Sequence, residues 1–177
     1  PADLKEFSPE SWWRMGDDDD AGGTTIRDLG VVSTTELVSN GEFEANTTGW
    51  TAAGTAALSI SSGRLRVTAD AAYQYAHQAV TTVVGATYTF SIEAVLGTST
   101  TWDAFIGTSA GGATLGSSYG TDLSASASGT WTGSFVATTT TTYINLRSRN
   151  EGASAGAYTD FDNVSVKQDD LVLNGAM

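Results

Sequence analysis

The pattern that most constrains the fold is a two-residue alternation of apolar and polar side chains in short stretches. In residues 87–94, Tyr88, Phe90, Ile92 and Ala94 fall on one side of an extended chain and polar residues on the other. The same alternation recurs in residues 63–68, 131–135, 143–147 and 162–166. No stretch between them has the period of a helix, so the sequence predicts an all-β fold, an antiparallel two-sheet β-sandwich. The alternation does not separate a jelly roll from an immunoglobulin-like topology.

The charge of the chain limits its partners. Eight Lys and Arg stand against twenty Asp and Glu, which gives a formal net charge of −12. Such a chain cannot neutralise a track of phosphates, so nucleic acid is excluded as a partner. No apolar run is long enough to span a membrane. Sugars, proteins and divalent cations are the partners that remain.

The sequence offers little material for catalysis. It has no cysteine, which excludes disulfides, thiolate metal sites and a cysteine nucleophile. Its one histidine, His77, lies in an alternating strand context, where a histidine is usually structural. No serine stands in a nucleophile elbow, and no buried acid is paired with a neighbouring base. We therefore expect no enzyme activity.

A repeated segment suggests how the chain is divided. Residues 36–43, Glu-Leu-Val-Ser-Asn-Gly-Glu-Phe, return in altered form as residues 170–177, Asp-Leu-Val-Leu-Asn-Gly-Ala-Met. The interval is about the size of one all-β domain. We expect a β-sandwich over residues 36–167, preceded by a connector or docking arm at 1–35. Residues 168–177 are then the start of a further repeat or a C-terminal tail.

The arm at residues 1–35 has too few apolar residues to form a core of its own. Trp12 and Trp13 are adjacent in it, and we expect both to dock against a neighbouring module, another copy of the chain or a partner protein. A sugar-stacking role for them is the alternative. The acidic run Asp17–Asp20 indicates a solvated loop, with a weak calcium-loop spacing as its alternative.

Three motifs in order resemble a known family. Residues 37–44 (Leu-Val-Ser-Asn-Gly-Glu-Phe-Glu) are followed by the Thr-Gly-Trp of residues 48–50. The middle stretch 75–91 comes next, and residues 161–167 (Phe-Asp-Asn-Val-Ser-Val-Lys) close the series. Together they resemble carbohydrate-binding modules of the 4/9/22-like jelly-roll type. The Thr, Ser, Ala and Gly bias and the closing motif also resemble phage fibre and appendage proteins.

The resemblance implies roles for several residues. Trp50 would be a buried plug beneath the first strand. Glu44 and Asp162 would hold a structural calcium ion that joins the two ends of the domain. Two carboxylates and a hard cation that prefers oxygen ligands make that chemistry reasonable. The alternative for Asp162 is a hydrogen-bonded partner of turn amides.

Sugar binding requires aromatic faces flanked by side chains that bond to hydroxyls. Tyr143, Asn145 and Arg147 share one strand face, opposite Ile144 and Leu146. The full set of candidates is Trp102, Tyr143, Asn145, Arg147, Tyr75 and Tyr119. The alternative for the rings is packing on the outer sheet or in an oligomer interface.

The sequence therefore predicts a non-catalytic, carbohydrate-binding-like module of a phage virion structural protein, such as a fibre, tail or capsid-decorating appendage. Its partners would be glycans or other virion proteins, and we expect a homo-oligomer at the virion surface or outside the cell. The alternative is an accessory glycan-binding module of a secreted polysaccharide-degrading enzyme.

Overall fold

The computed structural model describes residues 35–69, 74–112, 123–149 and 155–169. Within these ranges the chain forms ten strands and no helix, which confirms the predicted all-β class. No helix long and apolar enough for a membrane crossing occurs among these residues. The expected docking arm, with Trp12 and Trp13, lies outside the described residues, as does the second copy of the repeat at 170–177.

The strands follow one another closely along the chain. They are β1 (Thr51–Ala53), β2 (Ala57–Ser61), β3 (Arg64–Ala69), β4 (Tyr75–Thr81), β5 (Thr87–Leu96), β6 (Thr101–Gly107), β7 (Leu123–Ala125), β8 (Gly129–Val136), β9 (Thr141–Arg149) and β10 (Ala157–Gln168).

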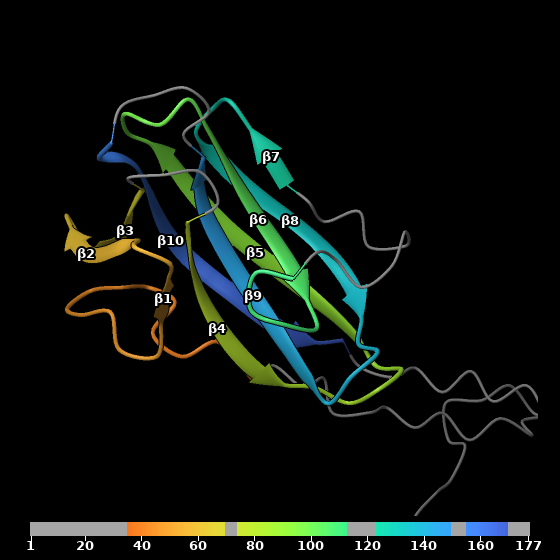
Figure 1. The fold of residues 1–177 in the computed structure, drawn as a ribbon. Coiled ribbons are helices and arrows are strands. Elements are labelled where there is room, and N and C mark those ends of the chain that lie inside the picture. The colour runs from red at the N-terminus through yellow and green to blue at the C-terminus, as the bar shows by residue number, and fades with distance from the viewer. Residues whose placement is uncertain (1–34, 70–73, 113–122, 150–154, 170–177) are drawn as a thin grey trace, which may run out of the picture. The chain divides into compact units, whose positions relative to one another are not determined.

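Two five-stranded sheets are stacked into a sandwich (Figure 1). The first, called here the β9 sheet, has the order β1-β4-β9-β6-β7. The second, called the β10 sheet, has the order β2-β3-β10-β5-β8. All strand pairs are antiparallel, as predicted. Each sheet is thus built around a late strand of the chain.

The core lies between the inner faces of the two sheets. Tyr88, Phe90, Ile92 and Ala94 of β5 are all buried, as their alternation predicts. Fully buried branched and aromatic side chains from both sheets complete the cluster, among them Leu65, Val67, Trp102, Ile144, Leu146 and Phe161. Burial of this apolar surface supplies the main favourable term for the fold. It also fixes which residues of each strand face outward.

The opening segment is tied to the end of β10. The Glu36 carboxylate accepts hydrogen bonds from the amides of Val38 and Val166, at 3.0 and 2.8 Å. A Cβ atom on Gly41 would lie 2.0 Å from the Val164 carbonyl oxygen, so only glycine fits there. Phe43 is fully buried. The motif therefore builds the junction between the first and last segments of the sandwich.

Trp50 has the position that the resemblance implies. It is 7% exposed, and its ring centroid lies 5.4 Å from that of Phe43. Its indole N–H donates to the Asn40 carbonyl at 3.3 Å. The indole is thus a buried plug whose polar atom is satisfied, as expected of a buried tryptophan.

Candidate functional site

The outer face of the β9 sheet carries an ordered grid of side chains from its three central strands. Strand register places Arg147 of β9 between Tyr75 of β4 and Asp103 of β6. In the next rung Asn145 lies between His77 and Phe105. One rung further, Tyr143 lies between Ala79 and Gly107. Because the alternate residues of these strands fill the core, all of these side chains point to the outer face.

Four rings of this grid lie within reach of one another, and we call them the aromatic face. Its members are Tyr75, His77, Phe105 and Tyr143. The Tyr75 centroid lies 5.8 Å from that of His77 and 6.1 Å from that of Phe105. The His77 and Tyr143 centroids are 6.1 Å apart. Tyr75, His77 and Tyr143 are half-buried, so each ring is held in place and still reaches solvent.

A buried carboxylate holds an arginine beside these rings. Asp103 is fully buried, and its Oδ2 accepts hydrogen bonds from Nε of Arg147, at 2.7 Å, and from Nη2. Nε of Arg149 lies 3.6 Å from the same oxygen. The Arg147 guanidinium lies 5.1 Å from the centre of the Phe105 ring, in cation–π geometry. Arg147 is therefore fixed in orientation from two sides.

Asn145 is on the predicted face but does not present its amide to a ligand. It is fully buried. Its amide nitrogen donates to the carbonyls of Phe105 and Tyr143, and its oxygen accepts from the Gly111 amide at 2.8 Å. The loop after β6 thus folds back over Asn145, and a Cβ on Gly111 would collide with the Tyr75 hydroxyl. Asn145 orders this loop, and the prediction of direct sugar contact through it is wrong for this structure.

Trp102 corrects a second sequence prediction. It is fully buried on the inner face of β6, with its ring 4.5 Å from Trp131 and 5.9 Å from Phe161. Its indole N–H donates to the Ala127 carbonyl at 3.1 Å. A ring enclosed on all sides cannot stack on a pyranose, so Trp102 is a core residue and not a binding residue.

The other predicted contacts divide by position. Tyr75, Tyr143 and Arg147 come together on the outer face of the β9 sheet, where their sugar-binding role stays a prediction. Tyr119 lies outside the described residues. The sequence reasoning missed His77, Phe105 and Asp103 as members of this face. His77 could have been found, because it lies two residues after Tyr75 in one strand and so shares its side.

His77 is unusual in its surroundings. Its Nδ1 is buried and has no hydrogen-bond partner among the described residues. Burial lowers the pKa of His77 below its ordinary value, which favours the neutral imidazole. A neutral, half-buried ring can pack against a sugar, whereas the buried Nδ1 has no surface open to a hydroxyl.

The two carboxylates expected to hold calcium are arranged differently from a metal site. Glu44 is exposed, and Asp162 lies on β10 with its Oδ1 accepting a hydrogen bond from the Asn163 amide at 2.8 Å. Nη1 of Arg64 is 3.7 Å from Oδ2 of Asp162. In the described part of the chain, no three acidic or histidine side chains are grouped so that they could share one metal ion. The residues present therefore do not fit the calcium site that the resemblance implies.

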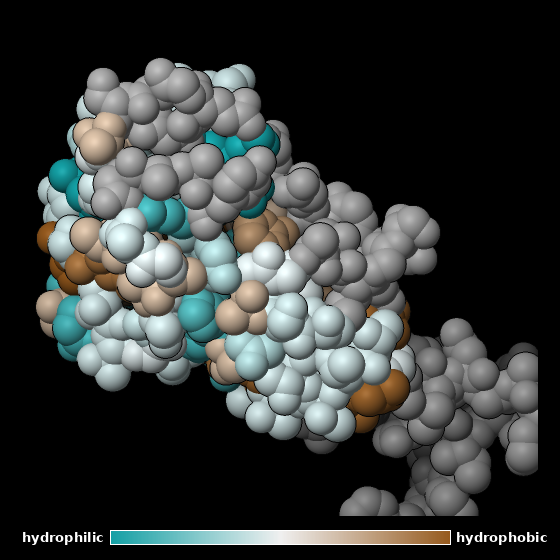
Figure 2. Space-filling view, viewed as in Figure 1, coloured by the Kyte–Doolittle hydropathy of each residue, from teal (hydrophilic) through white to brown (hydrophobic). Residues whose placement is uncertain are grey.

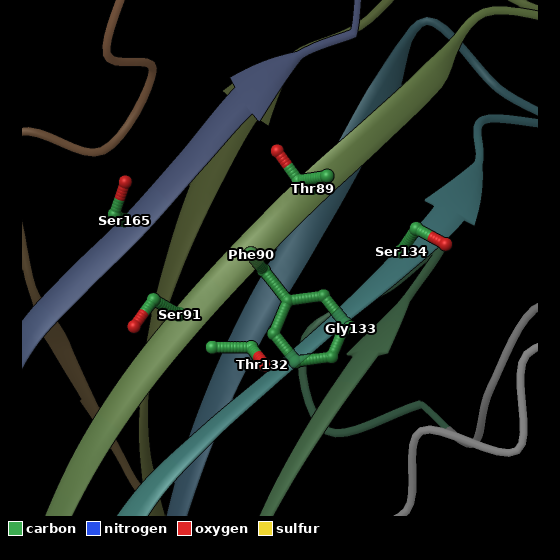
Figure 3. Close-up of a pocket in the computed structure, with 7 residues that line it drawn as sticks. All are labelled: Thr89, Phe90, Ser91, Thr132, Gly133, Ser134 and Ser165. Atoms are coloured by element: carbon green, nitrogen blue, oxygen red, sulfur yellow. The ribbon is translucent and has the colours of Figure 1, made fainter.

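A shallow depression of about 440 Å³ lies on the opposite side of the molecule, over the outer face of the β10 sheet (Figure 3). Hydroxyl side chains of β5, β8 and β10 surround it, and Phe90 and Gly133 lie at its floor. A Cβ on Gly133 would lie 2.6 Å from the ring of the buried Phe90, so glycine lets this ring pack close to β8. It lacks the exposed rings and charged groups of the aromatic face.

The visible surface in Figure 2 is mostly pale or teal, with hydrophobic colour confined to small patches. The exposed large hydrophobic residues of the described chain are Val83 and Val84, 60% and 58% exposed, in the turn after β4. Two valines form too small a patch for a broad apolar interface. The grid on the β9 sheet is therefore the better candidate for a functional surface.

Neither a protein-family model nor a curated protein matches the sequence. Solved structures do match the fold. The N-terminal cellulose-binding domain of Cellulomonas fimi β-1,4-glucanase C is 26% identical with a TM-score of 0.54, over 77% of this chain and 99% of that one. A CBM22 xylan-binding domain from Paenibacillus barcinonensis is 16% identical with a TM-score of 0.56, over 79% and 98%.

A phage protein contains the same sandwich. The enzymatically active domain of tailspike protein 4 from bacteriophage CBA120 matches at 14% identity with a TM-score of 0.50, over 75% of this chain and 21% of that one. These comparisons confirm that the chain has the jelly-roll β-sandwich fold of carbohydrate-binding modules, as the sequence motifs indicate.

Proposed function

We propose that the chain is a non-catalytic glycan-binding module and that the aromatic face is its contact surface. One observation carries the proposal: three half-buried rings, Tyr75, His77 and Tyr143, lie on one outer face of the sandwich beside the immobilised Arg147. Known binding sites combine apolar walls with a small number of well-placed polar groups, and this face has both.

The face offers two kinds of contact to a sugar. Tyr75 and Tyr143 lie on either side of His77, so the rings run along the sheet surface and suit successive units of a chain more than a single buried residue. The apolar C–H side of a pyranose can pack on each ring. Arg147 is held by Asp103 and can donate hydrogen bonds to hydroxyls without a large loss of side-chain entropy on binding.

The arrangement argues against catalysis as part of the same proposal. Glycoside hydrolysis requires two carboxyl groups placed on either side of the scissile bond. On the aromatic face the acid is Asp103, which is fully buried and bound by two guanidinium groups. A carboxylate in that position holds Arg147 and is poorly placed to exchange a proton with a substrate.

The setting we propose is a phage virion appendage, at the virion surface or outside the cell, where the module attaches to glycans or to other virion proteins. The occurrence of this sandwich within a phage tailspike chain supports it. Trp12 and Trp13 would serve as docking residues in a homo-oligomer. The alternative is an accessory module of a secreted polysaccharide-degrading enzyme. The likeness to the cellulose-binding domain of a glucanase supports it.

Affinity gel electrophoresis against soluble polysaccharides tests the binding claim. The panel would contain xylan, mixed-linkage β-glucan, galactan, hydroxyethyl cellulose and a bacterial O-polysaccharide. We expect at least one of them to retard the wild-type chain and Tyr143→Ala to abolish the retardation. Ser134→Ala, on the outer face of the β10 sheet, is the matched control and should migrate as the wild type. Failure of every polysaccharide to retard the wild type would contradict the proposal.

The complete polypeptide separates the two settings. A virion appendage should join the sandwich to fibre, tail or further repeat segments. An accessory module should share its polypeptide with a catalytic domain. Tandem sandwiches in either setting would raise avidity for a repeating glycan.

A further inference from the structure

Arg64 lies at the centre of a carboxylate cluster on the outer face of the β10 sheet. Its Nη2 donates to Oε1 of Glu93 at 2.7 Å, and its Nη1 lies 3.7 Å from Oδ2 of Asp162. Arg64 is on β3, Asp162 on β10 and Glu93 on β5, which are neighbours in the sheet. One guanidinium therefore spans three adjacent strands.

A third carboxylate approaches the same place from the opening segment of the chain. Oε2 of Glu44 lies 3.8 Å from the position of a Cβ built on Gly63, the residue before Arg64. Burial raises the pKa of Asp162, and the charges of Glu93 and Glu44 raise it further, against the opposing effects of the Asn163 amide and Arg64. Asp162 is therefore within electrostatic reach of both other acids, and Arg64 supplies a positive charge beside it.

We infer that the Arg64 guanidinium takes the structural place that the sequence resemblance gives to calcium, so that the sandwich is joined at this point by a side chain and does not require a divalent ion. Nη1 of Arg64 is buried and reaches toward Asp162. Calcium needs six to eight oxygen ligands, and a dication beside a fixed guanidinium meets strong repulsion. The side-chain amide of Asn163 also joins the cluster, because it donates a 2.8 Å hydrogen bond to Oε2 of Glu93.

Calcium and the Arg64 guanidinium would give Glu44 opposite effects on the stability of the fold. If calcium joined the ends of the domain, Glu44 would be a ligand and its removal would destabilise the fold. If Arg64 does so, Glu44 is an exposed acid that adds repulsion near Asp162. Glu93 is different, because it bonds to both Arg64 and Asn163. Glu44→Gln and Glu93→Gln therefore form a matched pair of isosteric changes.

Thermal unfolding of the intact chain, in EDTA and in millimolar calcium chloride, tests the inference. We expect the wild-type melting temperature to differ by less than about 1 °C between the two conditions, because no bound ion stabilises the folded state. Glu44→Gln should melt at or slightly above the wild type. Glu93→Gln should melt lower by about 4 °C, which corresponds to roughly one lost interaction in a domain of this size.

Two melting results would contradict the role of Arg64. A wild-type melting temperature that falls by several degrees in EDTA would overturn the inference, and so would a loss of stability in Glu44→Gln that appears only when calcium is present. The wild-type comparison needs no substitution and stands even if a variant fails to fold. Calcium titration of the wild type and of Glu44→Gln by calorimetry gives an independent check, and heat of specific binding that is lost in Glu44→Gln would also overturn it.

Discussion

The outer face of each sheet carries an ion pair between an arginine and an aspartate, and the two pairs have different surroundings. On the β10 sheet Arg66 binds Asp160 through two bonds of 2.8 Å, and the guanidinium lies 3.7 Å from the centre of the Tyr158 ring. On the β9 sheet Arg147 binds Asp103 beside Phe105. Both pairs link neighbouring strands.

What differs is the surroundings of each pair. The Arg66 pair lies beside a single half-buried ring, Tyr158, on a face that otherwise presents hydroxyls and further ion pairs. The Arg147 pair lies among half-buried rings, and its acid is fully buried. The difference is therefore the grouping of several rings near Arg147, against one ring at Arg66.

The largest loss of stability is expected from Trp102→Ala, which removes a large side chain from the core between the two sheets. Because Trp102 is fully buried and packs against Trp131 and Phe161, we expect a loss of about 4 kcal/mol in unfolding free energy. Urea denaturation measures it. A variant that kept its stability and lost only polysaccharide affinity would show that Trp102 belongs to the surface after all.

Asp103→Asn and Asp160→Asn compare the two ion pairs directly. Asp103→Asn removes a fully buried negative charge that pairs with the half-buried Arg147 and Arg149, and it should cost about 3 kcal/mol in unfolding free energy. Asp160→Asn should cost about 1 kcal/mol, because its pair is nearer to solvent.

Affinity for the retarding polysaccharide extends this comparison. It should fall in Asp103→Asn, measured at a temperature where the variant is folded, and stay unchanged in Asp160→Asn. Equal polysaccharide affinity in both variants would show that the position of Arg147 does not contribute to glycan binding.

Tyr75→Ala and Tyr143→Ala probe the rings with little change in the core. Each should weaken polysaccharide binding about tenfold, equivalent to about 1.4 kcal/mol, while the unfolding free energy changes by less. Both rings are half-buried and lie outside the core cluster, which is the reason for the small effect on stability. Thr132→Ala on the other face is the control. Comparable losses of affinity from that control would remove the distinction between the faces.

The smallest effect concerns pH. The folded pKa of His77 is lowered, so the folded state disfavours the proton that the unfolded chain accepts near pH 6.5. The contribution of neutral His77 to stability is present above that pH and is lost as the pH falls through the folded pKa. His77→Gln should therefore show a weaker decline in melting temperature between pH 7 and pH 5 than the wild type. Parallel declines would contradict the assigned environment of His77.

Strands in which apolar and polar residues alternate could be predicted from the sequence, whereas the orientation of β6 could not. β3 and β5 have one buried and one more open side, so their sequences record the sheet faces. In β6 every residue from Trp102 to Gly107 is buried, so no alternation marks which side Trp102 faces. The prediction of Trp102 as a sugar-binding residue failed for that reason.

The metal prediction depends on surroundings of Asp162 that the sequence could not show. The motif brings Glu44 and Asp162 toward the same region, as the sequence order suggests, but it does not show which strands flank β10. Only the strand order places Arg64 and Glu93 on either side of Asp162. A charge on the neighbouring strand, far away in sequence, bears on whether the two acids need an ion.

Backbone and side-chain NMR of the chain, titrated with an oligosaccharide of the retarding polysaccharide, tests the central claim most directly. The account predicts that the largest shift changes fall on Tyr75, His77, Tyr143 and Arg147, while Thr89, Thr132 and Ser165 across the sandwich stay unchanged. Shift changes centred on the hydroxyl-lined depression of the β10 sheet would contradict it.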